Sequence, residues 1–536
     1  MGKRERMSSV DTAWLRMDSQ ANLMMIVGVY EFDGRIDYER LRKLYEERFL
    51  PHARFRSFVG QDPLGYYWEV DDNFDLDLHL ARTALPGKGT TADLKRLVGR
   101  LASMALDANK PLWQVHLVDN YNGGQALIVR IHHCIADGIS LIGVLLAMAS
   151  DDPAEDSSES DDRTRSGGNS AGLVGTFLRP LTDATVRAIG TTGAAAARAL
   201  KTSAALLGHP DSVGGAAGDM ARVAVQVTRD LAGIALMDDD AATSLKGVPS
   251  GSKVVAWNEP LGLDDVKAVG KAIACSVNDV LLACVSGAIR SYLEQQGEEV
   301  DGIELRAMVP VNLRDPRKWK ELGNKFGLVP LLLPVGIANP IARVYEVRRR
   351  MDELKQGYTA MLSMGILGAV GFAPRGVQKQ ALDFLAKKAT AVMTNVPGPQ
   401  QPLYLAGAQI RRMMFWVPQS GNIGMGVSIL SYAGGVQFGL ITDKRLCEEP
   451  QRIIDRFEPE FEKLVMALCM LPWEGGVDAD QAENWIFPPI EPHKAVRRSG
   501  PRKRRAVKRR VAKAAAGAAV ASAADEPVAA SVPRVS

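Results

Sequence analysis

IHHCIADGIS, from Ile131 to Ser140, holds two of the seven histidines in a chain of 536 residues. The residues before the histidines, ALIVR from Ala126, are apolar and β-prone, whereas GISLIGVLLAMA from Gly138 has the apolar spacing of a helix. The sequence therefore predicts a strand that ends at the histidines and a turn that leads into a helix. Active-site residues are often found at such a position, because the strand holds them rigidly while the turn exposes them.

The adjacent histidines, His132 and His133, predict acid–base chemistry. An imidazole titrates near neutral pH, so it can take a proton from an alcohol or a thiol and return one later. The pattern favours one histidine as the base and Asp137 as a nearby orienting group. A structural histidine pair and a metal site are the alternatives. We expect no metal, because zinc takes three or four ligands, HHxxxD offers at most three, and no His or Cys cluster with ligand spacing stands nearby.

Length and composition indicate a soluble globular protein of two or more domains. The chain is too long for one core, and its 46% hydrophobic and 24% charged residues are typical of globular proteins. The five cysteines are scattered and form no C-x-x-C pair, which favours a reduced, cytoplasmic setting. The first residues, MGKRERMSSVDTAWLRM, lack the apolar run of a signal peptide.

The sequence contains no apolar stretch long enough to span a bilayer, which needs about 18 residues. The nearest candidate, Met361 to Pro374, is short and rich in glycine. It is interpreted either as a buried helix or as a surface segment that dips into a lipid interface.

Positive charge is concentrated in the C-terminal tail. The residues from Glu491 to Ser536 have a net charge of +9, which leaves −6 for the rest of a chain whose net charge is +3. Eleven of the twenty residues from Lys494 to Lys513 are Lys or Arg. Such a run is either a solvated extension or a contact to an anionic surface. We expect a lipid surface and no nucleic acid, because the rest of the chain contains no nucleic-acid-binding motif.

Composition divides the chain into four parts. Residues 1–150 and 253–475 each mix predicted strands with amphipathic helices, as in an α/β fold. Residues 151–252 begin with an acidic, serine-rich linker and continue as an Ala-, Gly- and Thr-rich segment that predicts a helical crossover. Residues 476–536 form the basic tail, whose composition predicts disorder. A crevice between two α/β halves would be a natural ligand site.

Further motifs accompany the histidines in a fixed order. They are PLW at Pro111–Trp113, ND at Asn278 and Asp279, VPVNLRDP at Val309–Pro316 and TNVPGP at Thr394–Pro399. With the opening MSSVDTAWL, this set resembles the bacterial wax ester synthase/diacylglycerol acyltransferase family over residues near 7 to 472. HHxxxDG alone is shared with peptide-synthetase condensation domains, so the additional motifs make the resemblance more specific. The acidic linker and the basic tail are not part of the family pattern.

The resemblance implies a fold and an activity. The fold would be α/β, with two chloramphenicol-acetyltransferase-like domains, a helical crossover and a central substrate tunnel. The reaction would transfer an acyl group from acyl-CoA to diacylglycerol or a long-chain alcohol, without a cofactor and without an acyl-enzyme. The enzyme would work at the inner membrane or at lipid droplets. Alternatives are a condensation-type acyltransferase that uses a carrier-protein thioester, and a non-catalytic lipid-associated protein.

The resemblance also implies roles for single residues. His133 would be the base that deprotonates the acceptor hydroxyl, with His132 beside it. Asp137 would be structural and would pair with an arginine, for which Arg314 is the candidate. Gly138 would permit the tight turn into the helix.

The ND motif, Asn278 and Asp279, begins a strongly predicted helix for which Ser276 is the candidate N-cap. Asn278 would support the active site from the second half of the chain. Its alternative role is a helix cap.

Overall fold

The computed structural model describes residues 4–152, 237–313, 323–356 and 386–470, together with Ser363, Gly376, Gln380 and Phe384. These residues all belong to one compact unit that ends at Ile486. Residues 153–236 of the predicted linker and crossover, the basic tail, Arg314 and all but one residue of the apolar segment 361–374 lie outside the described residues. The predictions made for them therefore remain predictions.

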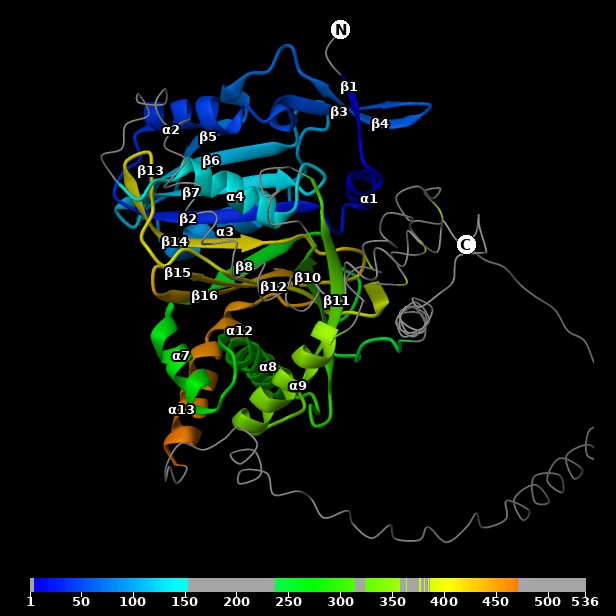
Figure 1. Ribbon diagram of the computed structural model, residues 1–536, viewed down its shortest axis with the longest axis vertical. Coiled ribbons are helices and arrows are strands. Elements are labelled where there is room, and N and C mark those ends of the chain that lie inside the picture. Colours follow the sequence, from blue (N-terminus) through cyan, green and yellow to red (C-terminus); the bar gives the residue numbers. More distant parts are fainter. Residues whose placement is uncertain are drawn as a thin grey trace, which may run out of the picture. The chain divides into compact units, whose positions relative to one another are not determined.

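A six-stranded sheet, here called the N-terminal sheet, carries the HHxxxDG motif (Figure 1). Its strand order is β13-β14-β2-β7-β6-β5, with bounds Tyr404–Leu405, Ala408–Trp416, Met25–Asp33, Gly124–His132, Trp113–Tyr121 and Leu80–Ala84. β6 and β7 form a hairpin, whose turn uses positive φ at Asn120, Asn122 and Gly123. Asn and Gly tolerate this backbone better than other residues do, which explains the NYNGGQ sequence.

The helices of the N-terminal part are α1, α2, α3 and α4, which span Ser9–Met17, Tyr38–Leu44, Thr91–Ala102 and Gly138–Met148. Short helical turns η1, η2 and η3 cover Tyr45–Phe49, Ala53–Arg56 and Leu76–Leu78. A separate three-stranded sheet, β1-β4-β3, is formed by Arg4–Arg6, Gly65–Val70 and Ser57–Asp62.

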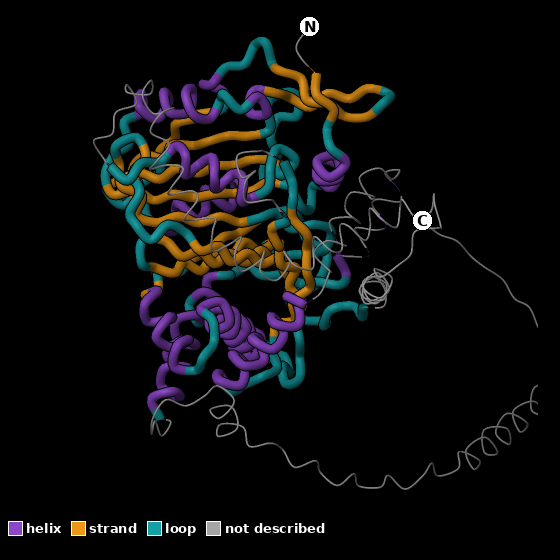
Figure 2. Tube along the Cα trace, viewed as in Figure 1, coloured by secondary structure: helices purple, strands orange, loops and turns teal. Residues whose placement is uncertain are grey.

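A second large sheet, the C-terminal sheet, has the order β11-β10-β12-β15-β16-β8, and β9 also pairs with β16. In this order the bounds are Phe326–Leu333, Leu305–Asn312, Ala391–Pro397, Met425–Tyr432, Gly435–Asp443 and Lys253–Trp257, with β9 at Leu261–Gly262. Figure 2 shows helices grouped beside this sheet. They are α7, α8, α9, α12 and α13, at Leu263–Ala272, Val277–Gln295, Pro340–Gln356, Gln451–Ile454 and Phe457–Cys469.

The C-terminal part of the chain contributes a hairpin to the N-terminal sheet. β13 and β14 come late in the sequence, yet β14 pairs antiparallel with β2 and so completes the N-terminal sheet. Arg411 and Arg412 of β14 approach the fully buried carboxylate of Glu31 on β2, at 2.9 and 3.6 Å. The sequence-based division at residue 253 does not predict that strands from the second half of the chain join the N-terminal sheet.

Apolar side chains fill both faces of the N-terminal sheet. One core includes Trp113, which is fully buried and donates from Nε1 to the carbonyl of Phe55 at 2.7 Å. The other core lies against α3 and includes Trp257 and Trp416. Trp113 of the PLW motif therefore packs in the core. Among the described helices, none alone is long and apolar enough to cross a bilayer, although α7 and α8 pass that test as a pair bent by 101°.

Candidate active site

The predicted strand–turn–helix around the histidines is confirmed. β7 ends at His132, and α4 begins at Gly138 with Asp137 as its N-cap. The five residues between them form a buried loop at the end of the strand. This loop is fixed to three other segments of the chain, which come from both halves.

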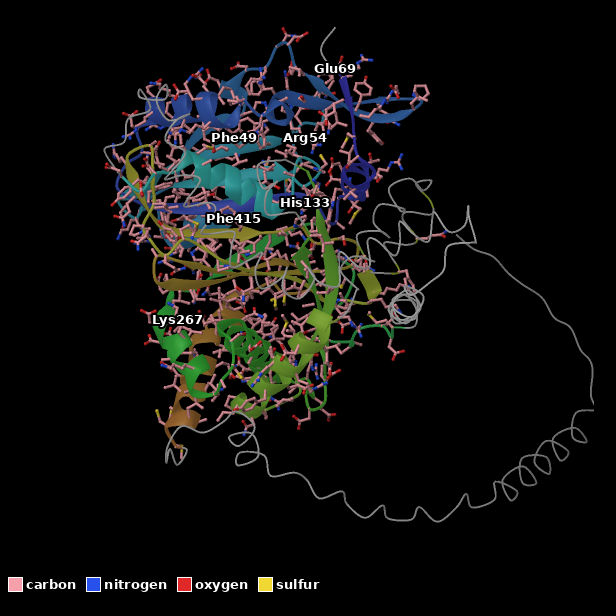
Figure 3. The ribbon with its side chains drawn as sticks, viewed as in Figure 1. Phe49, Arg54, Glu69, His133, Lys267 and Phe415 are labelled. Atoms are coloured by element: carbon pink, nitrogen blue, oxygen red, sulfur yellow. The ribbon has the colours of Figure 1, made fainter. Side chains whose placement is uncertain are left out.

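His133 is held by its backbone and by aromatic neighbours. Its N–H donates to the carbonyl of Met24 at 2.7 Å, and its carbonyl accepts from the amide Nδ2 of Asn324 at 2.8 Å. The imidazole stacks on the indole of Trp14, with ring centroids 4.2 Å apart and an interplanar angle of 19°. Phe326, the first residue of β11, lies 5.4 Å away, and Figure 3 shows His133 beside α1 and the start of β11.

Burial keeps the His133 imidazole neutral at physiological pH. Removal from water lowers its pKa from 6.5 to about 4, although the negative charge of Asp137 acts in the opposite direction. A general base must be unprotonated before it acts, so this environment holds His133 in the active form.

His132 is occupied by the loop itself. Its Nδ1 accepts a hydrogen bond from the backbone N–H of Cys134 at 3.1 Å, which places the ring proton on Nε2. That Nε2 atom lies 3.9 Å from the carboxylate of Asp18 at the end of α1. Burial, followed by the neighbouring His133, lowers its pKa to about 3. His132 therefore shapes the loop, and His133 is the better candidate for the base.

Asp137 has a structural position, as its predicted role requires. Oδ1 accepts from both the N–H and the hydroxyl of Ser140, at 2.9 and 2.7 Å, which caps α4. Oδ2 accepts from the backbone N–H of Lys325 at 3.0 Å, just before β11. Asp137 thus joins the loop to the C-terminal sheet. The proposed pairing with Arg314 lies outside the described residues.

The predicted role of Gly138 needs correction. Gly138 is the first residue of α4 and has helical backbone geometry, so no glycine-specific turn is required there. A Cβ at this position would meet only a methyl of Val417, at 4.0 Å. The turn is made instead by the loop that precedes Asp137.

Three residues that sequence reasoning missed support the loop. Asn324 Nδ2 donates both to His133 O and to the carboxylate of Asp11, each at 2.8 Å. Arg54 donates to the carbonyl of Ile135 at 2.9 Å and lies 3.3 Å from the same Asp11 carboxylate. Burial raises the pKa of Asp11. Asp11 and Trp14 both lie in the opening motif MSSVDTAWL, so the sequence could have suggested a role for them at the site. Nothing in the sequence marks Asn324.

The ND motif lies at the start of α8, where the predicted cap is confirmed. Ser276 and Asp279 form a reciprocal capping box, so Asp279 stabilises the helix end. Asn278 is therefore not the cap. Its Oδ1 accepts from Nδ2 of Asn395 at 2.5 Å, which ties α8 to β12. The described contacts of His133 do not include Asn278, so the support of the base by Asn278 stays a prediction.

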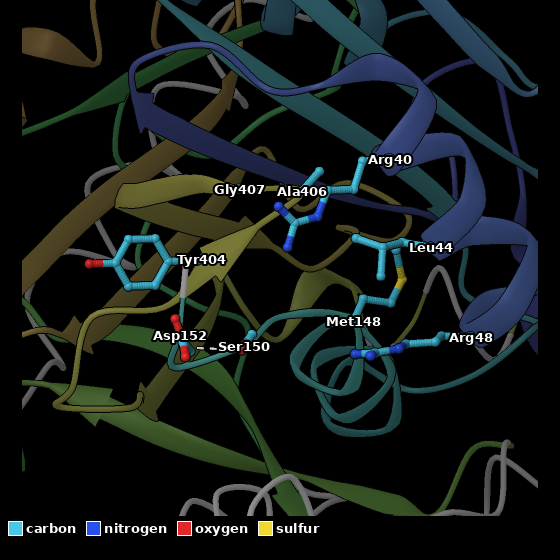
Figure 4. Close-up of a pocket in the computed structure, with 9 residues that line it drawn as sticks. All are labelled: Arg40, Leu44, Arg48, Met148, Ser150, Asp152, Tyr404, Ala406 and Gly407. Atoms are coloured by element: carbon cyan, nitrogen blue, oxygen red, sulfur yellow. Dashed lines mark hydrogen bonds between the residues drawn. The ribbon is translucent and has the colours of Figure 1, made fainter. Parts of the chain in front are cut away.

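A hollow in the surface lies away from the histidines. Figure 4 shows that it is formed by α2 and η1, the end of α4 and the β13–β14 turn. Its lining is Arg40, Leu44, Arg48, Met148, Ser150, Asp152, Tyr404, Ala406 and Gly407. None of these residues belongs to the loop after β7. Among the described residues no cluster of three His, Cys, Asp or Glu side chains is placed to hold a metal ion.

Solved structures define the class of fold. A wax ester synthase/diacylglycerol acyltransferase from Marinobacter aquaeolei VT8 superimposes with a TM-score of 0.59 at 22% identity, covering 87% of this chain and all of that one. The first condensation domain of the calcium-dependent antibiotic synthetase gives 0.51 at 14% identity, covering 89% and 98%. The fold is therefore α/β, with two chloramphenicol-acetyltransferase-like domains.

Sequence comparison gives the family. The model of the wax ester synthase/diacylglycerol acyltransferase catalytic domain matches residues 7–281, and that of the family's C-terminal domain matches residues 322–465. Two probable diacylglycerol O-acyltransferases of Mycobacterium tuberculosis are similar, at 27% identity over 85% of this chain and 98% of theirs, and at 28% over 80% and 88%. The chain belongs to this family and is an acyltransferase.

Replacement of Asp137 tests its structural role. Asp137→Ala removes the cap of α4 and the bond to Lys325, so we expect a loss of stability of at least about 1 to 2 kcal/mol, together with a loss of turnover. Urea denaturation and a rate assay measure the two effects. Thr90→Ala is the matched control, because Thr90 caps α3 in the same way but far from His133. Equal effects of both variants on turnover would contradict the role of Asp137.

Proposed function

We propose that this enzyme transfers the acyl group of a long-chain acyl-CoA to the hydroxyl of diacylglycerol or a long-chain alcohol. The products are triacylglycerol or wax esters and free CoA. The observation that carries the proposal is the buried, neutral imidazole of His133 at the end of β7. The names of the similar proteins, which are diacylglycerol O-acyltransferases and a wax ester synthase, support the choice of acceptors.

The chemistry follows from the low proton affinity of the buried ring. An alcohol has a pKa far above 7, so His133 accepts its proton only as the oxygen attacks the thioester carbonyl. The tetrahedral adduct then collapses and the carbon–sulfur bond breaks. The departing thiolate takes the proton from the imidazolium, because a thiol has a pKa of about 8.5 and the buried imidazole has one of about 4. Acyl transfer is direct, and neither a metal nor a cofactor takes part.

Two features assist the base in this scheme. Asp137 maintains the loop by its bonds to Ser140 and Lys325, and it keeps a negative charge near the imidazolium that forms. The tunnel predicted between the halves would bring the acyl chain and the acceptor to His133, which Phe326 at the start of β11 contacts.

The substrate assay is the direct test of this function. Purified enzyme with labelled palmitoyl-CoA should form labelled lipid with diacylglycerol, with hexadecanol or with both. His133→Ala should reduce turnover by about a hundredfold or more, the usual effect of removing a general base. His116→Ala is the control, because burial lowers the pKa of His116 to about 4 as well, although it lies on β6. Turnover only with a palmitoyl carrier-protein thioester would favour the condensation-type acyltransferase. No turnover with any donor would favour a non-catalytic lipid-associated protein.

The pH dependence of the rate tests the state of His133. The base acts when neutral and is lost on protonation, so a pKa of about 4 places the acid limb of kcat/KM well below that of an ordinary histidine. We expect kcat/KM to stay level from pH 8 to about 5 and to fall below that. Circular dichroism at each pH is the control that tests whether the protein stays folded. A limb near pH 6.5 would contradict a buried base.

The acceptors and products are lipids, so we place the enzyme at the cytoplasmic face of the inner membrane or on lipid droplets. The run from Lys494 to Lys513 supports this placement by its charge, with eleven basic residues in twenty. Each basic residue near an anionic surface contributes about 1 kcal/mol.

Deletion of the residues after Pro492 should weaken binding to anionic vesicles and leave the rate on detergent-solubilised substrate unchanged. Cosedimentation measures the binding, which should also fall as salt rises, because salt screens the attraction. The control deletes only residues 514–536, which leaves the basic run intact. Equal binding by all three proteins at low and high salt would show that the tail does not contact lipid.

A further inference from the structure

The orientation of the His133 ring is not explained by hydrogen bonds to it. Its backbone is fixed on both sides by Met24 and Asn324, but the side chain can still turn about its χ2 bond. Nδ1 is buried and has no partner with full hydrogen-bond geometry among the described residues, although its own backbone and the Asn324 amide interact with the ring closely enough to raise its pKa against the effect of burial. In a serine protease triad a carboxylate holds the corresponding nitrogen and thereby fixes the ring. Here Asp137 directs its two oxygens to Ser140 and to Lys325 N–H.

Aromatic rings contact the imidazole instead of a carboxylate. Trp14 covers one face nearly parallel to it, with centroids 4.2 Å apart. Phe326 packs on both rings, 5.4 Å from His133 and 5.7 Å from Trp14. Trp14 and Phe326 are 5% and 7% exposed. A turn of the imidazole about χ2 would drive its edge into the indole, so the stack restricts the ring to one plane.

The helix that carries Trp14 is itself fixed relative to His133. One turn before Trp14, the carboxylate of Asp11 binds Asn324, the same amide that holds the His133 carbonyl. One turn after it, Asp18 accepts from the N–H of Met24 at 2.7 Å, and the Met24 carbonyl accepts from His133. Both ends of α1 are thus joined to the histidine's own backbone contacts, so the indole cannot shift independently of the ring.

We infer that Trp14 is the positioning residue of the base: its indole face holds the His133 imidazole in the plane required for proton transfer. The inference rests on the proposed function of His133. The same face is electron-rich and lies against a ring that becomes positive during the reaction. Such a contact stabilises a buried cation and so adds to the effect on the rate.

Two substitutions at Trp14 separate the ring from the bulk. Trp14→Met keeps a flexible apolar side chain but removes the flat face, and we expect kcat to fall about tenfold to a hundredfold, the usual effect of a misplaced catalytic group. KM for palmitoyl-CoA and for the acceptor should change less than about threefold, because Trp14 acts on the base. Trp14→Phe restores a flat ring and should recover most of kcat.

Trp257→Met is the matched control. Trp257 is 2% exposed and packs against Trp416 in the other core, so its loss should lower stability without lowering kcat. Kinetics are measured where circular dichroism shows each variant to be folded. If Trp14→Met does not fold, Trp14→Leu takes its place in the comparison with Trp14→Phe, which should retain most of the wild-type kcat.

The outcomes separate this inference from the proposed function. An inactive His133→Ala enzyme together with a fully active, folded Trp14→Met enzyme would overturn only the role of Trp14. Equal loss in Trp14→Met and Trp14→Phe, or a loss that appears in KM alone, would also overturn it. An active His133→Ala enzyme would overturn the assignment of the base, and the positioning role with it.

Discussion

The amide of Asn324 is the interaction on which the geometry of this site depends. Its two N–H groups donate to the carboxylate of Asp11 and to the carbonyl of His133, each over 2.8 Å. Both acceptors are buried and belong to the N-terminal part of the chain, whereas Asn324 stands just before β11 of the C-terminal sheet. Leaving a buried acceptor without its donor costs about 1 to 3 kcal/mol, so Asn324 holds the two parts of the chain in one relative position at His133. The conformation of the loop that contains His133 therefore depends on both halves.

The prediction from sequence succeeded where the signal was local. The apolar run before His132 and the helical spacing after Gly138 placed the strand, the loop and the helix correctly. Ser276 was identified as the candidate cap because it directly precedes a segment with helical spacing, and the structure confirms it.

What could not be predicted depends on contacts between distant segments. Asn324 is 191 positions from His133, and no periodicity or spacing links the two. Arg54 likewise reaches Ile135 from 81 positions away. The resemblance assigned Gly138 to a turn, but α4 begins at that residue with Asp137 as its cap. The low pKa of His133 also needs the fold, because it follows from burial by residues of several elements.

The late position of β13 and β14 in the sequence has a consequence for folding during translation. As the chain leaves the ribosome, β2 can pair with β7 long before its other neighbour, β14, has been made. Glu31 of β2 and Arg411 of β14 are 380 positions apart. Until translation reaches Arg411, one edge of β2 is unpaired and the carboxylate of Glu31 lacks its arginine partners. Open edges favour pairing between chains, so the nascent protein is exposed to aggregation until most of it has been synthesised. Completion of the N-terminal sheet is thus a late step, and the hairpin that completes it is the last part of that sheet to be made.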